Sequence, residues 1–209
     1  MIAMKVNKND WVREEKIKAR EETIIKIYSV LFDQQSLPLD KQYWTLCSKC
    51  INDGKIIENT EPYQVINSGL IRPHQFHGVE IEIEIHNINK TCSDLNFYHG
   101  DLLSVLRQEA HKPDFNPAIV NADFFGTPIT EAKKFLDILY LLRNQRDIMV
   151  VGNFSLQAKH KKFVPDDIII ELNKHSLVKE ISKVWKYSQC YEYISSAYKM
   201  GTIIFYKRK

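Results

Sequence analysis

The stretch QFHGVEIEIEIHNINK, residues 75–90, joins a short apolar run at residues 75–81 to a charged, helix-like segment at Glu84–Lys90. The run is short enough for a strand, and no hairpin turn follows it. A strand that leads directly into a helix is the first half of a β-α-β unit, in which the strands are parallel. This stretch therefore predicts an α/β fold.

The same alternation of short apolar runs and helical patterns extends on both sides of this stretch. It is typical of a mostly parallel sheet whose helices cover its faces. The expected strands are Tyr43–Cys47, Gln75–Ile81, Asn96–Tyr98, Ala118–Asn121 and Ile148–Asn153. The expected helices are Thr60–Ser68, Glu84–Lys90, Leu102–Ala110, Thr130–Arg143 and Asp166–Val184.

The C-terminal end breaks this alternation. Gln189–Ser195 and Thr202–Lys207 are two β-like runs, and the segment between them is too short for a helix. Two strands joined by so short a connection pair antiparallel as a hairpin. The sequence thus predicts seven strands, of which the last two form an antiparallel hairpin.

The N-terminal end predicts one long amphipathic helix from Asp10, which can cap it, to Phe32. Its first half is charged nearly all round, so we expect it to be solvated and the second half to pack. A contact of this helix with nucleic acid, a partner protein or a second copy is the alternative. A turn-like stretch at residues 33–40 separates the helix from the rest. We therefore predict a helical extension at 1–40 and an α/β domain at 41–209.

Composition sets the broad class. Hydrophobic residues make up 44% of the 209 residues and charged residues 26%, as in ordinary globular domains. Four cysteines are too few for a disulfide framework, and no stretch approaches the roughly 20 apolar residues that span a bilayer. The first residues lack the apolar segment of a signal peptide, so we expect a cytoplasmic protein without membrane contact. A net charge of +3 permits a nucleic-acid partner without requiring one.

The strand at residues 76–82 and the helix after it resemble the second strand and helix of class I S-adenosylmethionine-dependent methyltransferases. In that family an acidic residue at the end of this strand accepts hydrogen bonds from both ribose hydroxyls of the cofactor. Glu80, followed by Ile81, matches that position. A carboxylate suits the task because it offers two acceptors at the spacing of a vicinal diol.

Residues 95–103 are similar to the family's third motif, in which an aspartate after the third strand accepts from the exocyclic amine of adenine. Gly100 and Asp101 match this motif, and the amide of Leu102 would face the ring. About twenty residues separate Glu80 from Asp101, as one helical crossover requires. The resemblance therefore implies S-adenosylmethionine as cofactor and a Rossmann-like, mostly parallel seven-stranded sheet.

Residues 117–125 resemble the family's fourth strand, whose carboxyl end faces the methyl acceptor. Asn121 and Asp123 are the expected catalytic residues, since ligands of open α/β sheets lie where the strand order reverses. The stretch Asn121–Pro128 has no cysteine for attack on a cytosine carbon. It keeps an acid and aromatics but lacks the two prolines typical of exocyclic-amine methylation.

The sequence departs from the family in the loop after the first strand. There the family has a glycine-rich turn, but among residues 43–54 only Gly54 is glycine. The small Cys47 and Ser48 are the expected cofactor contacts in this loop. Two interpretations stay open: a methyltransferase with an altered cofactor pose, and a catalytically inactive methyltransferase-like module for nucleic-acid or protein interaction.

Two further patterns bear on ligands. Cys47 and Cys50, spaced as Cys-x-x-Cys, suggest a redox pair, or a zinc site with His74 and His77. The helix-breaking residues after Cys50 disfavour the first and the histidine spacing disfavours the second, so we predict no metal. Basic residues at 159–162 and 206–209 are possible phosphate contacts, and a nucleic-acid acceptor is favoured.

Overall fold

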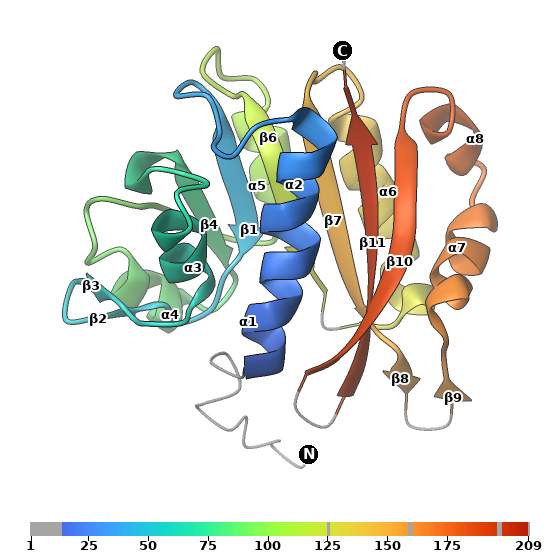
Figure 1. The fold of residues 1–209 in the computed structure, drawn as a ribbon, viewed down its shortest axis with the longest axis horizontal. Helices are drawn as coiled ribbons and strands as arrows, with labels where there is room; N and C mark the ends of the chain where they lie inside the picture. The colour runs from blue at the N-terminus through green and yellow to red at the C-terminus, as the bar shows by residue number, and fades with distance from the viewer. Residues whose placement is uncertain (1–13, 125, 159–160, 196–197, 209) are drawn as a thin grey trace.

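The computed structural model describes residues 14–124, 126–158, 161–195 and 198–208, and it shows a seven-stranded sheet covered by helices (Figure 1). The strand order is β10-β11-β7-β6-β1-β4-β5. The seven strands are β1 (Gln42–Leu46), β4 (Phe76–Glu80), β5 (Asn96–His99), β6 (Pro117–Asp123), β7 (Ile148–Ser155), β10 (Lys186–Ser195) and β11 (Tyr198–Lys207).

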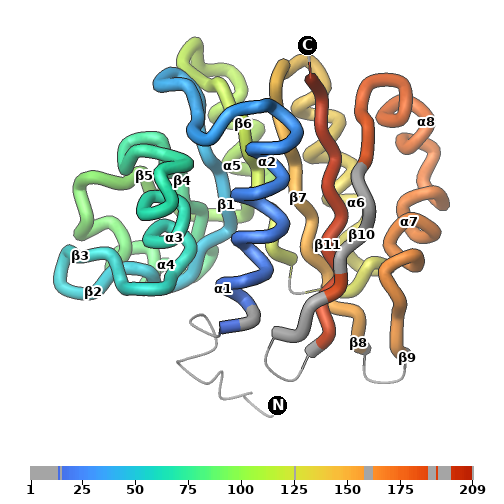
Figure 2. The backbone as a smooth tube through the Cα atoms, in the orientation of Figure 1, coloured from blue at the N-terminus to red at the C-terminus, as the bar shows by residue number. Residues whose placement is uncertain are grey.

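Pairing within the sheet is parallel from β5 through β4, β1 and β6 to β7. β11 pairs antiparallel with β7 and with β10. This confirms the predicted fold: a mostly parallel seven-stranded sheet with a C-terminal antiparallel hairpin. Figure 2 shows β4 and β5 on one side of β1, and β6 and β7 on the other. The strand order therefore reverses between β1 and β6, where an open α/β sheet leaves a crevice for ligands.

Helices cover both faces of the sheet. On one face the core joins the strands to α5 (Leu102–Glu109), α6 (Pro128–Leu141), α7 (Pro165–Asn173) and α8 (Val178–Ile181). On the other face the core includes side chains of α2 (Lys26–Phe32) and α3 (Glu61–Asn67), while α4 (Ile83–Asn89) packs beside β4 and β5. Tyr43 belongs to one core and Trp44 to the other, because successive side chains of a strand point to opposite faces.

The N-terminal helix packs across the sheet (Figure 1). It consists of α1 (Glu14–Arg20), a π-helical turn (Glu21–Ile25) and α2. The prediction of one uninterrupted α-helix is wrong at the π turn, and its start at Asp10 lies outside the described residues. The Thr23 hydroxyl donates to the Ala19 carbonyl at 2.8 Å, the kind of back-bond that bends helices. Ile24, Tyr28 and Phe32 are buried in the core.

Other bounds also differ from expectation, and in the C-terminal hairpin β10 begins at Lys186 instead of Gln189 and β11 at Tyr198 instead of Thr202. The helix predicted over Asp166–Val184 is two helices, α7 and α8, because the intervening Lys174-His175-Ser176 has little helix propensity apart from its lysine. Gln75 ends a 3₁₀ turn, so β4 begins one residue later. Two small hairpins, β2–β3 (Ile51–Asn52, Lys55–Ile56) and β8–β9 (Gln157–Ala158, Lys161–Lys162), were not anticipated. In the described ranges, no helix is long and apolar enough to cross a membrane.

Candidate functional site

The carboxyl ends of β1, β4 and β5 form one continuous edge. The Cys47 amide donates to the Val79 carbonyl at 2.9 Å, and the Gly100 amide donates to the Glu80 carbonyl at 3.0 Å. The structure thereby brings the predicted cofactor residues to this edge: Cys47, Ser48, Glu80, Ile81, Gly100, Asp101 and Leu102.

Glu80 ends β4 with its side chain only 7% exposed. Its Oε1 accepts from the Glu82 amide at 2.9 Å. Burial raises the pKa of the Glu80 carboxyl, although the amides of Glu82 and Ile81 partly oppose this rise. Ile81, the next residue, is 66% exposed. The end of β4 thus presents a desolvated carboxylate beside an exposed apolar side chain, a combination suited to a ribose diol and an aromatic base.

Asp101 begins α5 as its N-cap. Its Oδ1 accepts from the Ser104 amide at 3.3 Å and lies 3.5 Å from Lys134 Nζ. Burial alone would raise the pKa of Asp101, but the contacts with Ser104 and Lys134 outweigh burial and lower it. Gly100 has φ +139°, which side-chain-bearing residues rarely adopt, so the turn into α5 favours glycine. Leu102 is buried, so only its backbone can face a ligand.

Hydrogen bonds within the protein fix the loop after β1, which we call the first-strand loop. Asn89 of α4 accepts from the Cys50 amide at 3.0 Å and donates to the Ser48 carbonyl at 2.9 Å. The Cys47 amide is bonded to Val79, as described above. A side chain at Gly78 would lie 2.6 Å from Cys47 Sγ, so the sulfur closes the space beside β4. The amides of Cys47 and Cys50 are therefore engaged, unlike those of an open glycine-rich turn.

The cysteines themselves are buried thiols. A hydrogen bond with Cys50 and burial raise the pKa of Cys47 well above its ordinary value. A redox pair would need a lowered thiol pKa instead. His77 lies on the opposite face, stacked on Trp44 and 3.1 Å from the Tyr98 hydroxyl. Across the described residues, no three or more metal-ligating side chains gather at one point.

A buried polar network lies beneath the end of β6. Glu61 Oε1 accepts from the Tyr43 hydroxyl at 2.6 Å and from Asn121 Nδ2 at 2.9 Å. Asn121 Oδ1 accepts from Asn153 Nδ2 at 3.0 Å, and Asn153 Oδ1 accepts from the Thr202 hydroxyl at 2.6 Å. Burial, followed by the nearby Glu61 carboxylate, raises the pKa of Tyr43 well above its ordinary value. Asn121 is 2% exposed and has both amide atoms bonded inside this network.

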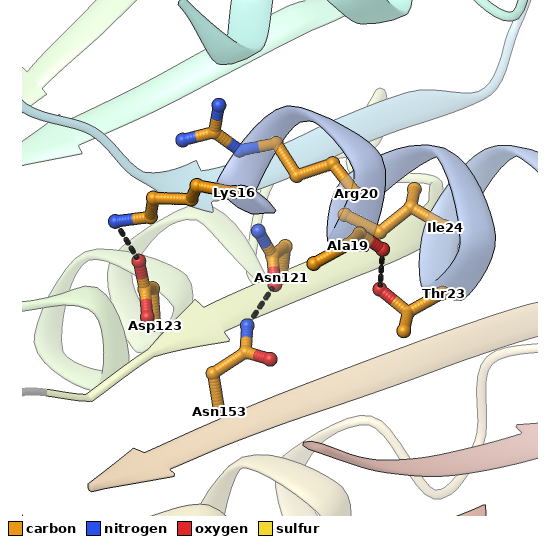
Figure 3. A pocket seen from close by; sticks show the side chains of 8 residues that line it. All are labelled: Lys16, Ala19, Arg20, Thr23, Ile24, Asn121, Asp123 and Asn153. Atoms are coloured by element: carbon orange, nitrogen blue, oxygen red, sulfur yellow. Dashed lines mark hydrogen bonds and ion pairs between the residues drawn. The ribbon is translucent and has the colours of Figure 1, made fainter. Parts of the chain in front are cut away.

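Asp123 ends β6, two residues beyond Asn121, and faces helix α1. Lys16 Nζ lies 3.1 Å from Asp123 Oδ2, and both side chains are 19% exposed (Figure 3). One turn along α1, Arg20 Nε lies 3.5 Å from Glu61 Oε2. The expectation that the first half of this helix is solvated is thus wrong for these two cations, which lie against the edge of the sheet.

Lys16, Arg20 and Glu61 were not among the site residues predicted from the sequence. The i, i+4 spacing of the two cations, in phase with the buried Ile24 and Tyr28, is a signal that one helix face meets the sheet. Glu61 stands before a proline at the start of a helix, where an acidic residue is common for reasons unrelated to a site.

The predicted basic patches are only partly described. Lys159, His160 and Lys209 lie outside the described residues, and Lys162 is exposed. Lys207 donates to the Leu142 carbonyl at 3.3 Å and lies over the Trp185 ring. Burial lowers the pKa of Lys207 to about 8. The Lys207 amine is therefore engaged at the end of α6 in this structure.

Solved structures that are similar to this chain include methyltransferases. M. capricolum TrmK, in complex with S-adenosylhomocysteine, is 11% identical, with 90% of this chain and 69% of that chain aligned at a TM-score of 0.50. A Bacillus cereus O-methyltransferase with the same ligand is 10% identical over 94% of this chain and 98% of that chain, also at 0.50. A putative tRNA (m1A22) methyltransferase of Streptococcus pneumoniae is 10% identical, with 90% of this chain and 72% of that chain aligned at a TM-score of 0.50.

No family model matches the chain, and no curated protein does. The likeness to solved structures, together with the strand order, defines the class: the chain has the fold of class I S-adenosylmethionine-dependent methyltransferases. At this identity the likeness establishes the fold, and the chemistry has to be argued from the site.

Proposed function

We propose that this protein binds S-adenosylmethionine at the carboxyl edge of its sheet and transfers the methyl group to an acceptor. The observation that carries the proposal is the placement of Glu80 and Asp101 at the ends of adjacent strands, beside the point where strand order reverses. Glu80 would accept from the ribose hydroxyls. Asp101 and the Leu102 amide would face adenine, with Ile81 and Gly100 beside them and Cys47 and Ser48 across the first-strand loop.

The bound cofactor would supply a methyl group activated by its positive sulfur, and the protein's task would be to align an acceptor for in-line displacement. Asp123 is partly exposed at the carboxyl end of β6, whereas Asn121 is buried and both of its side-chain amide atoms are hydrogen-bonded. Within this proposal Asp123 faces the acceptor, and Asn121 acts by positioning β6 and Glu61.

Isothermal titration with S-adenosylmethionine and S-adenosylhomocysteine tests the binding step. We expect saturable one-site binding to the wild type and a loss of about 10-fold or more in affinity for Glu80→Ala, since hydrogen bonds to a charged group contribute about 1.5–3 kcal/mol. Glu82→Ala is the matched control, because Glu82 is an exposed carboxylate two residues away. No heat of binding with the wild type would refute the cofactor site. Equal affinity of Glu80→Ala and Glu82→Ala for the cofactor would refute the role of Glu80.

A nucleic-acid acceptor is our further proposal. One of the similar structures is named a putative tRNA (m1A22) methyltransferase, and the sequence carries a small positive net charge. Transfer of labelled methyl groups to RNA, DNA and protein fractions would identify the class of acceptor. Phosphate contacts also predict that binding in a gel-shift series weakens steeply as salt rises. Label found only in protein would contradict this choice.

A catalytically inactive binding module is the second candidate. It is favoured by the engaged amides of the first-strand loop and by helix α1, whose Lys16 is ion-paired with Asp123. Nucleic-acid binding without any heat from the cofactor would identify this alternative.

A further inference from the structure

The first-strand loop leaves open which groups would hold the amino-acid end of the cofactor. This inference rests on the proposed function and concerns the same edge of the sheet. We propose that helix α1 supplies this part of the site: Lys16 and Arg20 bind the α-carboxylate of the ligand, and Asp123 binds its α-ammonium group.

The first support is a pocket between α1, the first-strand loop and the start of α3. It is lined by Lys16, Arg20, Leu46, Cys47, Ser48, Lys49, Cys50, Thr60, Glu61, Pro62 and Asp123. The pocket thus adjoins the first-strand loop. This loop is hydrogen-bonded to β4, the strand that ends in Glu80, because the Cys47 amide donates to the Val79 carbonyl. The proposal places the ribose of the ligand at Glu80 and its amino-acid end in this pocket.

The second support is the set of charges. Lys16 and Arg20 are i, i+4 on α1, and each lies close to a carboxylate, at 3.1 Å from Asp123 and 3.5 Å from Glu61. Arg20 Nη1 also donates to Gln64 Oε1 at 3.1 Å. The side chain of Arg20 is only 11% exposed and that of Lys16 only 19%. These charges are therefore partly desolvated, and leaving one of them unpaired would cost free energy.

A zwitterionic ligand group suits this set of paired charges better than a simple anion does. An α-amino-acid end brings a carboxylate and an ammonium group together, so Lys16 and Asp123 can each exchange one partner for another. The number of ion pairs is then kept or increased. A ligand with only a negative charge would pair Lys16 but leave Asp123 alone, at the cost of a partly buried, uncompensated carboxylate.

The third support is how α1 is attached. α2 is held by Tyr28 and Phe32 in the core, whereas none of the residues of α1 that the structure describes is fully buried. The π-helical turn separates the two segments, and such turns occur frequently at functional sites. α1 can therefore adjust its ion pairs to a ligand while α2 stays anchored.

Isothermal titration with two ligands tests the inference: S-adenosylhomocysteine, and 5′-methylthioadenosine, which lacks the amino-acid end. We expect the wild type to bind S-adenosylhomocysteine at least about 10-fold more tightly. Lys16→Met combined with Arg20→Gln should remove most of this preference while leaving the Kd of 5′-methylthioadenosine unchanged. Asp123→Asn should reduce the preference in part. Lys26→Met, which removes an exposed cation of α2, should change neither Kd.

Equal affinity of the wild type for the two ligands would overturn the inference, and this comparison does not depend on any variant folding. An unchanged preference in the double variant would also overturn it. Both results leave cofactor binding itself intact. Absence of binding by either ligand to the wild type would instead refute the proposed function and this inference with it.

Discussion

The two halves of the carboxyl edge are built in different ways. At the ends of β4 and β5, Glu80 is bonded to amides of its own loop and Asp101 to the first turn of its own helix. At the ends of β1 and β6, Glu61, Asn121 and Asp123 are tied to side chains from α1, β1 and β7. The first half uses mainly local contacts that a ligand can supplement, apart from the ion pair between Asp101 and Lys134. The second half uses long-range contacts, and the buried hydrogen bonds of Glu61 among them stabilise the domain.

The largest expected effect lies in the second half. Glu61→Ala should lower the free energy of unfolding by about 3–5 kcal/mol, because it strands the buried Tyr43 hydroxyl and Asn121 amide and leaves Arg20 unpaired. Urea denaturation measures this loss. Glu180→Ala breaks an exposed ion pair and should cost at most about 1 kcal/mol. Similar losses for both variants would show that the contacts of Glu61 add no more stability than an exposed ion pair.

Glu80→Gln should have the opposite signature. It should weaken cofactor binding by about 10-fold or more yet leave the folded protein as stable or more stable at neutral pH. The raised pKa means that the folded state holds the Glu80 proton more tightly than the unfolded state does. This carboxyl therefore stabilises at low pH, and its contribution falls as pH rises through the raised pKa. A clear loss of thermal stability in Glu80→Gln would show that Glu80 is structural.

The pH dependence of binding sharpens the same point. If the ionised Glu80 holds the ribose, cofactor affinity in the wild type should fall as pH is lowered through the raised pKa of Glu80. The fall should begin at a higher pH than for an ordinary glutamate. Titrations across pH 4–8, at about 1-unit intervals, would measure this, with Glu80→Ala as the reference that lacks this response. A flat profile for the wild type would contradict the role.

The smallest effect is expected at Asp101. Asp101→Ala removes an N-cap and one partner of Lys134, which should cost about 1 kcal/mol of stability. Asp101→Asn keeps a capping oxygen and should recover most of that loss. Thermal unfolding compares the two variants. A loss as large as that of Glu61→Ala would mean that the β5 end is also held by more than local contacts.

Much of the fold could be predicted because it depends on local patterns. Strand-to-helix alternation and the short connection between the runs that end at Ser195 and begin at Thr202 were enough to predict the parallel sheet and its antiparallel hairpin. Glu80 and Asp101 were predicted because the residues around each resemble a family motif that stands at the end of a strand. Helix continuity was less predictable, since a single back-bonding threonine at residue 23 accompanies the π turn.

The second half of the edge could not be predicted in the same way. Arg20 meets Glu61 across 41 residues of chain, and Lys16 meets Asp123 across 107. A charged helix segment usually faces solvent, so its composition gave no sign of which cations turn inward. The packing of α2, with Tyr28 and Phe32 buried in the core, determines which side of α1 faces the sheet, and the i, i+4 spacing noted above is the trace of it in the sequence.

Hydrogen exchange with and without S-adenosylhomocysteine tests most directly whether one ligand joins the two halves. We predict slower amide exchange on ligand addition at residues 80–83 and 101–104, and in the same experiment at residues 14–20 and 47–50. Residues 26–32 of α2 should be unchanged, because the core already protects them. Protection of only one half, or of neither, would contradict the proposal that one ligand joins them, and so would protection confined to segments remote from the carboxyl edge.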